Sequence, residues 1–259
     1  MLSIPVNKRH LCFMVLFVLL SGCRHLPQRE VLFQASTIQV LSAGVYDGQT
    51  DLRELKKKGD FGLGTFQGLE GEMVALDGNF YQVKADGNVY RLREASGVPF
   101  AQVTFFDADK VFTAENELDY AQLRRYLDGL LDSRNIFYAV KISGRFKYVK
   151  VRSVPRQAKP YPELGRALKE EKVFELRGIE GTAVGFRCPG YSENIFPGGY
   201  HLHFISRDKI SGGHLLDFSV SGARIEVDQT PDLYLSLPME KDFLDLELSA
   251  GKEEGGRNE

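Results

Sequence analysis

Short segments rich in β-branched and aromatic residues, separated by Asp-Gly dipeptides, place the tightest constraint on the fold of this chain. We expect strands at residues 73–76, 79–83 and 89–92, with turns at Asp77-Gly78 and Asp86-Gly87 between them. An Asp-Gly pair suits a two-residue hairpin turn, because the central positions need a positive φ that Asp tolerates and Gly adopts freely. The pattern therefore predicts consecutive β-hairpins in the first half of the chain.

The rest of the chain also favours strands, with two helical interruptions. Strands are predicted at 101–106, at 137–144 and 146–154 with a turn at Gly144-Arg145 between the last two, and again from Val173. Residues 117–133 carry apolar side chains at a spacing near 3.6, which predicts an amphipathic helix, and 162–171 predicts a shorter one. The prolines at positions 155, 160 and 162 remove backbone donors, so this segment is predicted to be an irregular linker.

These elements together predict an α+β fold rich in strand, in which two mixed β-sheet halves carry a few helices. We expect an N-terminal β-rich domain at 33–154, a Pro-rich linker at 155–163, a C-terminal metal-binding β domain at 164–250 and a tail at 251–259. Residues 68–76 and 178–186 share a Gly, an aliphatic residue, a Glu, a second Gly and a Val, as a duplication would produce. Chance agreement in a Gly-rich chain gives the same pattern, so the sequence leaves a duplication open.

Residues 1–23 have the features of an export signal. Lys8 and Arg9 precede an uncharged run at 11–20, which is too short to span a bilayer, since spanning takes about 20 apolar residues. The tetrapeptide at 20–23, which ends at Cys23, resembles the bacterial lipobox, where cleavage exposes a cysteine that receives lipid. We therefore expect a lipoprotein signal peptide at 1–22, a tether at 23–32 and a protein exported and lipid-anchored at the cell envelope. An uncleaved anchor is the alternative.

Composition narrows the class of protein further. Loss of Cys12 with the signal and lipidation of Cys23 would leave Cys188 as the remaining thiol, so no intramolecular disulfide is expected. Hydrophobic residues make up 43% of the chain, enough for a core that needs no disulfide. The formal net charge is -2 and basic residues do not cluster, so nothing predicts a nucleic-acid partner.

Three of the five histidines fall close together, at His201, His203 and His214. The first two are two residues apart, so in a strand both imidazoles leave the same face. The glycines at 212 and 213, with Ser211, favour a turn that returns a neighbouring strand and His214 alongside. Three converging imidazoles without a fourth Cys or His nearby indicate a zinc site with an open position, as in catalytic centres. The alternative is a polar strand face with two solvated histidines and an unrelated third.

Two charged residues are candidates to complete such a site. Glu72 begins a predicted strand, where it either faces solvent or supplies a carboxyl for proton transfer. Arg152 alternates with valines, so its side chain points away from theirs, either toward solvent or inward to clamp a carboxylate. Local sequence does not decide either case. Nothing near the histidines matches His-Glu-x-x-His, so a zincin-type peptidase is not indicated.

Taken together, the motifs resemble those of the α-acetolactate decarboxylase family. The resemblance spans roughly residues 33–248, and its most specific block is His-x-His-Phe-Ile followed by Gly-Gly-His. The matching segments are 42–48 (SAGVYDG), 59–66 (GDFGLGTF), 69–72 (LEGE), 99–101 (PFA), 151–155 (VRSVP), 160–161 (PY), 197–205 (PGGYHLHFI), 212–214 (GGH) and 237–238 (LP).

The resemblance implies a zinc-dependent carboxy-lyase that converts (S)-2-acetolactate to (R)-acetoin and CO₂, with Zn²⁺ stabilising an enediolate. The metal ligands that it implies are His201, His203 and His214. By the same resemblance, Arg152 binds the substrate, Glu72 delivers the proton and Thr65 helps to line the pocket.

The resemblance also bears on the tail and on assembly. The family usually adds an active-site glutamate from its C-terminal tail, and Glu254 is the candidate here, beside Glu253. The family is usually dimeric, so a homodimer is expected, with acetolactate as substrate and membrane contact only through the lipid anchor. Two other functions stay open: another zinc-dependent lyase or hydrolase on the same scaffold, and a metal-binding module without catalysis.

Overall fold

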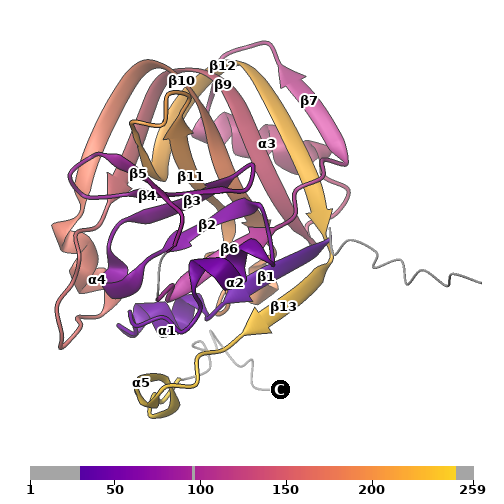
Figure 1. The fold of residues 1–259 in the computed structure, drawn as a ribbon. Helices are drawn as coiled ribbons and strands as arrows, with labels where there is room; N and C mark the ends of the chain where they lie inside the picture. Colours follow the sequence, from indigo (N-terminus) through magenta and orange to yellow (C-terminus); the bar gives the residue numbers. More distant parts are fainter. Residues whose placement is uncertain (1–29, 95–96, 249–259) are drawn as a thin grey trace, which may run out of the picture.

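Two β-sheets pack against each other in the computed structural model, which describes residues 30–94 and 97–248 (Figure 1). The first sheet has seven strands, and its β1–β13 pair is parallel while its other pairs are antiparallel. In spatial order the strands are β13 (Asp232–Ser236), β1 (Val31–Ala35), β6 (Phe100–Thr104), β2 (Phe61–Thr65), β3 (Glu72–Leu76), β4 (Asn79–Val83) and β5 (Val89–Leu92).

The second sheet is built around three long strands, β9 (Phe137–Ser153), β10 (Lys172–Cys188) and β12 (Gly212–Thr230), and all of its strand pairs are antiparallel. In spatial order the strands are β11 (Gly199–Ser206), β10, β9, β12 and β7 (Lys110–Ala114), and β8 (Leu118–Asp119) also pairs with β12. Because β11 pairs with β12 as well as with β10, the ends of these strands curl toward each other. The β-rich fold with two sheets is thus confirmed, and the first sheet is the mixed one.

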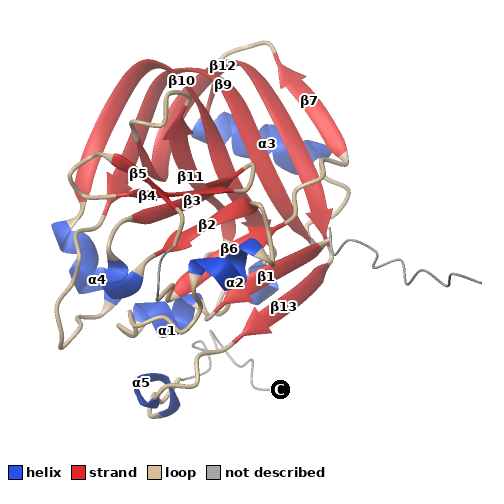
Figure 2. Ribbon diagram, in the orientation of Figure 1, coloured by secondary structure: helices blue, strands red, loops and turns tan. Residues whose placement is uncertain are grey.

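The helices are short (Figure 2). They are α1 (Ile38–Ser42), α2 (Leu52–Lys56), α3 (Tyr120–Leu130), α4 (Leu164–Ala167) and α5 (Lys241–Leu244), with 3₁₀ turns at Gln67–Leu69, Leu168–Glu170 and Gly190–Ser192. The helix expected at 117–133 begins later because Asp119 forms a capping box with Gln122. No helix in the described ranges has the length and apolar character needed to cross a membrane.

The hairpin strands predicted around the Asp-Gly turns are confirmed, but the turn predicted at Gly144-Arg145 is wrong. Residues 137–153 form one continuous strand, β9, whose two edges pair with β10 and β12. Gly144 serves close packing instead: a Cβ there would lie 3.1 Å from a methyl group of Val220 and 3.3 Å from the Cα of Ala223. A glycine within a paired strand was therefore mistaken for a turn signal.

The two sheets do not follow the boundaries expected from sequence. Strands β7, β8 and β9 precede residue 155 and yet belong to the second sheet, while β13 returns from the C-terminal part to join the first. The segment 155–163 is irregular as predicted, and it lies against the first sheet's loops, since Gln157 N–H donates to Gly68 O at 2.8 Å. The two segments that suggested a duplication also differ, because 68–76 contains a 3₁₀ turn whereas 178–186 lies within β10.

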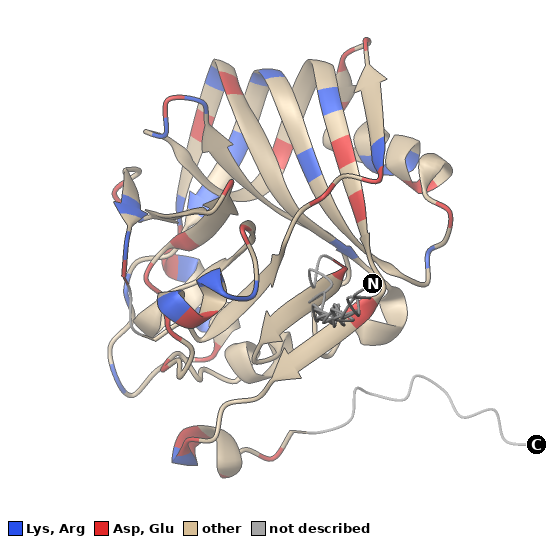
Figure 3. Ribbon diagram, turned by 45° about the vertical axis from the view of Figure 1, so that its right-hand side comes forward, with Lys and Arg blue, Asp and Glu red and all other residues tan. Residues whose placement is uncertain are grey.

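The hydrophobic core falls into three clusters. The first lies between the two sheets and includes Leu63 and Val74 from one side and Phe186 from the other. The second fills the curved inner face of the second sheet, and the third lies under α2 on the far side of the first sheet. The surface of the long strands carries bands of both charge signs (Figure 3).

Candidate active site

Strand register places three polar side chains in one row across the second sheet. His203 of β11 pairs with His214 of β12, and His214 pairs in turn with Arg152 of β9. Directly paired residues point to the same face, and His201 shares that face because it lies two residues before His203. The pairing of β11 with β12 therefore puts His201, His203 and His214 on one face of the sheet, as the sequence predicted.

The turn that returns His214 lies earlier than expected. Residues 207–210 form the turn, which is closed by the Ser206 N–H donating to Ser211 O at 2.8 Å, and Gly212 and Gly213 already belong to β12. The glycines are needed for close approach: a Cβ on Gly213 would lie 2.5 Å from Arg152 O, and one on Gly212 would lie 2.4 Å from Phe204 O. Their role is to bring strands together rather than to reverse the chain.

The three imidazoles converge at the spacing of a metal site. His214 Nδ1 lies 3.3 Å from His201 Nε2 and also 3.3 Å from His203 Nε2. All three ligand atoms lie within 4.8 Å of one another. In a tetrahedral zinc site with Zn–N bonds near 2.0–2.1 Å, ligand nitrogens lie about 3.3–3.4 Å apart. The distances from His214 to the other two histidines therefore match those between ligands in such a site.

The hydrogen bonds of the cluster favour metal ligation. His203 Nδ1 lies 2.8 Å from Met73 O, so that nitrogen donates and Nε2 presents a lone pair to the cluster. A proton on His214 Nδ1 could bridge to only one of its two neighbouring nitrogens. Burial lowers the pKa of all three imidazoles, that of His203 to about 3, so the rings are neutral as metal ligation requires.

Glu72 faces the histidines from the other sheet. It is the first residue of β3 and is 7% exposed, and its Oε2 lies 3.4 Å from His203 Nε2. Burial raises the pKa of Glu72 to about 7, an effect that Arg152 opposes and Glu171 adds to. Of the two orientations that the local sequence allowed, the structure has the inward one.

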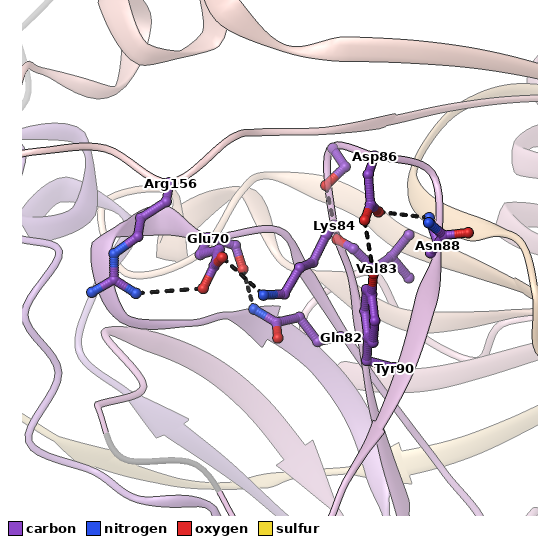
Figure 4. A network of polar contacts seen from close by, with 9 residues as sticks. Glu70, Gln82, Val83, Lys84, Asp86, Asn88, Tyr90 and Arg156 are labelled. Atoms are coloured by element: carbon purple, nitrogen blue, oxygen red, sulfur yellow. Dashed lines mark hydrogen bonds and ion pairs between the residues drawn. The ribbon is translucent and has the colours of Figure 1, made fainter.

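The segment before Glu72 is held by a polar network (Figure 4). The Glu70 carboxylate contacts Lys84 Nζ at 2.9 Å and Arg156 Nη1 at 3.4 Å, and its backbone oxygen accepts from Gln82 Nε2 at 2.7 Å. The Thr65 hydroxyl donates to Gly71 O at 2.7 Å. Thr65 therefore fixes the backbone that carries Glu72, in addition to lining the site.

Arg152 reaches the site from the side of β9. Its side chain is 15% exposed, and its Nη1 donates to Glu171 Oε2 at 3.1 Å. The structure thus also selects the inward orientation for Arg152, because its side chain lines the same cavity as the histidines.

A cavity of about 240 Å³ joins these groups. The expected site residues Thr65, Glu72 and Arg152 line it together with the three histidines. Apolar side chains form the rest of its wall: Ile38, Leu41, Leu69, Phe100, Val154, Leu164, Leu168 and Pro197. The cavity therefore offers a few polar groups in an apolar setting, which is typical of a small-molecule site.

Comparison with known proteins agrees with this geometry. The family model described as alpha-acetolactate decarboxylase matches residues 32–250. The chain belongs to the α-acetolactate decarboxylase family. A relative of that name from Methanosarcina mazei is 48% identical over 225 residues, covering 87% of this chain and 78% of the relative. One from Bacillus subtilis is 37% identical over 231 residues, covering 89% and 90%.

Solved structures of the α-acetolactate decarboxylase family share the fold. The crystal structure of the enzyme from Bacillus subtilis strain 168 matches with a TM-score of 0.83 at 37% identity, over 85% of this chain and 94% of that one. A protein from Staphylococcus aureus, described as similar to alpha-acetolactate decarboxylase, matches with a TM-score of 0.81 at 30% identity, over 85% and 94%. The expected enzyme class, a decarboxylase, is confirmed by this membership.

Two groups that the sequence did not single out contact residues of this site. Glu171 contacts Arg152, and the Met73 carbonyl orients His203. The contact of Glu171 with Arg152 follows from the register of β9 and β10, and no local sequence pattern predicts that register. Two predicted residues, Cys23 and Glu254, lie outside the described residues.

Proposed function

We propose that this chain catalyses the zinc-dependent decarboxylation of (S)-2-acetolactate to (R)-acetoin and CO₂. The observation that carries the proposal is the meeting of three histidine nitrogens, Glu72 and Arg152 in one cavity of a chain of this family. Curated relatives at 34% to 48% identity carry the name alpha-acetolactate decarboxylase. The substrate is a small β-keto acid, which suits a cavity of about 240 Å³.

His201, His203 and His214 would hold the metal. An all-nitrogen set of three ligands suits zinc and leaves a position free for substrate oxygen. When bound, the metal supplies Lewis-acid polarisation to the ketone and hydroxyl oxygens of the substrate.

Arg152 would bind the substrate carboxylate. Its guanidinium offers several N–H donors in a planar fork that matches a carboxylate, and its partial burial strengthens the contact. Arg152 lies in the same row as His214 and His203. A substrate held by Arg152 at one end and by the histidine site at the other would therefore lie along this row. Its carboxylate would then lie toward β9 and its ketone toward the histidines.

Glu72 would complete the reaction by delivering a proton. When the bond between the carboxylate carbon and C2 breaks, CO₂ leaves and the electron pair delocalises into the neighbouring ketone. A proton from the Glu72 carboxyl then goes to C2, and water restores the carboxyl. Glu72 approaches from β3, on the side opposite the second sheet, so the proton arrives from one face and one acetoin enantiomer forms.

Chiral analysis of the product tests the proposal. Zinc-loaded protein incubated with racemic acetolactate is expected to give a single acetoin enantiomer above the spontaneous rate. His203→Ala is expected to lose bound zinc and at least about 100-fold of the activity, the scale on which loss of an electrophilic group reduces turnover. The absence of acetoin above the spontaneous rate, with zinc bound, would overturn the assignment.

We further propose that the protein is a lipoprotein of the cell envelope. The proposal is supported by the charged start, the apolar run and the lipobox-like residues that end at Cys23. The intact mass of protein extracted from membranes is expected to show an acylated cysteine at the N-terminus. The Cys23→Ala variant is expected to be lost from the membrane fraction. An unmodified, unprocessed N-terminus would refute the anchor.

Glu254 stays the candidate for the active-site glutamate that the family usually supplies from its C-terminal tail.

A further inference from the structure

Glu171 lies beside the active site, outside the residues that line its cavity. Arg152 of β9 pairs with Val173 of β10, and Glu171 lies two residues before Val173. Diagonal neighbours of this kind share a face of the sheet and lie within reach of long side chains. The resulting contact joins Arg152 Nη1 to Glu171 Oε2 at 3.1 Å.

The backbone of Glu171 is fixed on both sides. Its N–H donates to Leu168 O at 3.2 Å and ends the 3₁₀ turn Leu168–Glu170, and β10 begins at the next residue. Leu168 itself lines the cavity. The carboxylate therefore projects from an anchored position, which is how residues that hold a catalytic group in place are supported.

The contact leaves most of the guanidinium available. Within the part of the chain that the structure describes, one nitrogen of the Arg152 guanidinium is engaged, whereas a guanidinium carries five N–H donors. Among the carboxylates that the structure describes, Glu171 is the one in contact with this guanidinium. Without a partner, the long arginine side chain would sample several rotamers, and ordering it on substrate binding would weaken affinity.

We propose that Glu171 is a positioning residue that holds one edge of Arg152, so that the remaining N–H groups face the cavity and receive the substrate carboxylate. This inference rests on the proposed decarboxylase function. Because the carboxylate is the group that leaves as CO₂, Arg152 contributes mainly to binding before the bond breaks. Loss of Glu171 therefore raises KM more than it lowers kcat.

Steady-state kinetics on acetolactate with a set of variants tests this. Glu171→Ala is expected to raise KM about 10-fold with kcat within about threefold of wild type, while Glu171→Gln, which keeps an acceptor oxygen, stays within about threefold in both. The matched control is Glu170→Ala, which removes the same charge one residue away and whose carboxylate contacts Gln157 at 3.5 Å. It is expected to leave KM unchanged.

A double-mutant cycle separates positioning from a general structural role. In an Arg152→Ala background, Glu171→Ala is expected to add no further rise in KM, because its effect passes through Arg152. An equal rise in both backgrounds, an unchanged KM in Glu171→Ala, or a Gln variant as impaired as the Ala variant would each overturn the proposal. Melting temperatures of the variants identify any that fail to fold, and Glu171→Gln then carries the test.

A binding measurement keeps this inference distinct from the reaction itself. Calorimetric titration with 2-hydroxyisobutyrate, a 2-hydroxy carboxylate without a ketone to decarboxylate, reports on binding through the hydroxyl and carboxylate contacts, that of Arg152 included, with no reaction following. Glu171→Ala is expected to weaken its binding about 10-fold even if wild-type protein produces no acetoin. Equal binding to wild type and Glu171→Ala would refute the positioning role, whereas absent acetoin would refute only the proposed reaction.

Discussion

Two buried carboxyl groups have a pKa raised to about 7, and their surroundings differ. At Glu72 burial raises the pKa while the Arg152 guanidinium opposes the shift. At Asp228 burial is again the main cause, the Asp107 N–H opposes it, and the neighbouring carboxylates of Asp109, Asp107 and Glu30 add to it. The ionised form of Asp228 is therefore unfavourable in the folded protein, and its charge is not part of the site.

Asp228 is expected to make folding stability fall as pH rises. Its folded pKa of about 7 exceeds the value of 3.8 for an ordinary aspartate, so the folded state holds a proton that the unfolded state has lost between these values. Stability from this group is complete below about pH 4 and declines up to about pH 7. Asp228→Asn is expected to gain at least about 1 kcal/mol over wild type at pH 8, the worth of one pKa unit, and much less at pH 5.

Thermal unfolding at both pH values measures this difference. A gain of about 1 kcal/mol corresponds to roughly 2–4 °C in Tm for a chain of this size. The control is Glu94→Gln, which removes a carboxylate at a side chain that is 85% exposed. A gain in Asp228→Asn that does not change with pH would contradict the assignment of the cause.

At this scale the sequence specified some site residues and left others undecided. The period of two in a strand predicted a shared face for His201 and His203, and that prediction is confirmed by the structure. Glu72 and Arg152 had two local interpretations each, and only the resemblance of whole motifs favoured the inward one. Glu171 carried no signal, because its importance depends on which residue of β9 lies opposite β10.

At the scale of elements, the turn that leads into β3 decides where Glu72 points. Gly71 has a φ of +75°, and a Cβ there would lie 2.3 Å from Val83 O. Its N–H donates to Val154 O at 2.9 Å, and its oxygen accepts from Thr65. The turn is therefore tied to the end of β2 and to the residue that follows β9.

Gly71→Ala is expected to lower kcat at least about 10-fold while zinc remains bound, because relief of the clash moves the backbone of Glu72 and misplaced catalytic groups lose rate steeply. Zinc content and kcat together measure this. The matched control is Gly78→Ala at the other end of β3, which has a φ of +72° but open space around the added methyl group. It is expected to lose about 1–2 kcal/mol of stability and to keep its kcat. An equal loss of kcat in both variants would contradict the role of the turn.

Element prediction succeeded where the signal was local and failed where it was not. The strand bounds at 79–83 and 89–92 agree with the structure because Asp-Gly turns separate them. The break predicted within β9 was wrong because Gly144 is required for close packing against the neighbouring strand and not for a turn. The turn expected at 211–213 was placed too late for the same reason.

At the scale of the molecule, the C-terminal arm at 232–248 runs along the edge of the first sheet as β13 and then extends past the sheet (Figure 1). Six of the twelve exposed large apolar side chains of the described residues lie in it: Leu233, Tyr234, Leu237, Met239, Leu244 and Leu248. Strand β13 of this arm is also the edge of the first sheet. An apolar arm beside an open strand edge is a surface that a second copy of the chain can cover around a two-fold axis.

We therefore expect a homodimer whose interface includes the arm. Light scattering of wild-type protein is expected to give the mass of a dimer, and Leu237→Glu combined with Met239→Glu is expected to give a folded monomer. The control is Ile210→Glu combined with Val111→Glu, which alters exposed apolar residues elsewhere and is expected to leave the dimer intact. A monomeric wild type, or a dimer unaffected by the arm variant, would refute this interface.

The row formed by His203, His214 and Arg152 limits where residues can be inserted or deleted without loss of the site. One codon gained within 212–213 would turn His214 to the opposite face of the sheet, because side chains alternate along a strand. Between the two histidines, only residues 207–211 lie outside the paired strands. We therefore expect insertions and deletions to be tolerated in that short stretch. In the strands on either side, the number of residues matters as much as their identity.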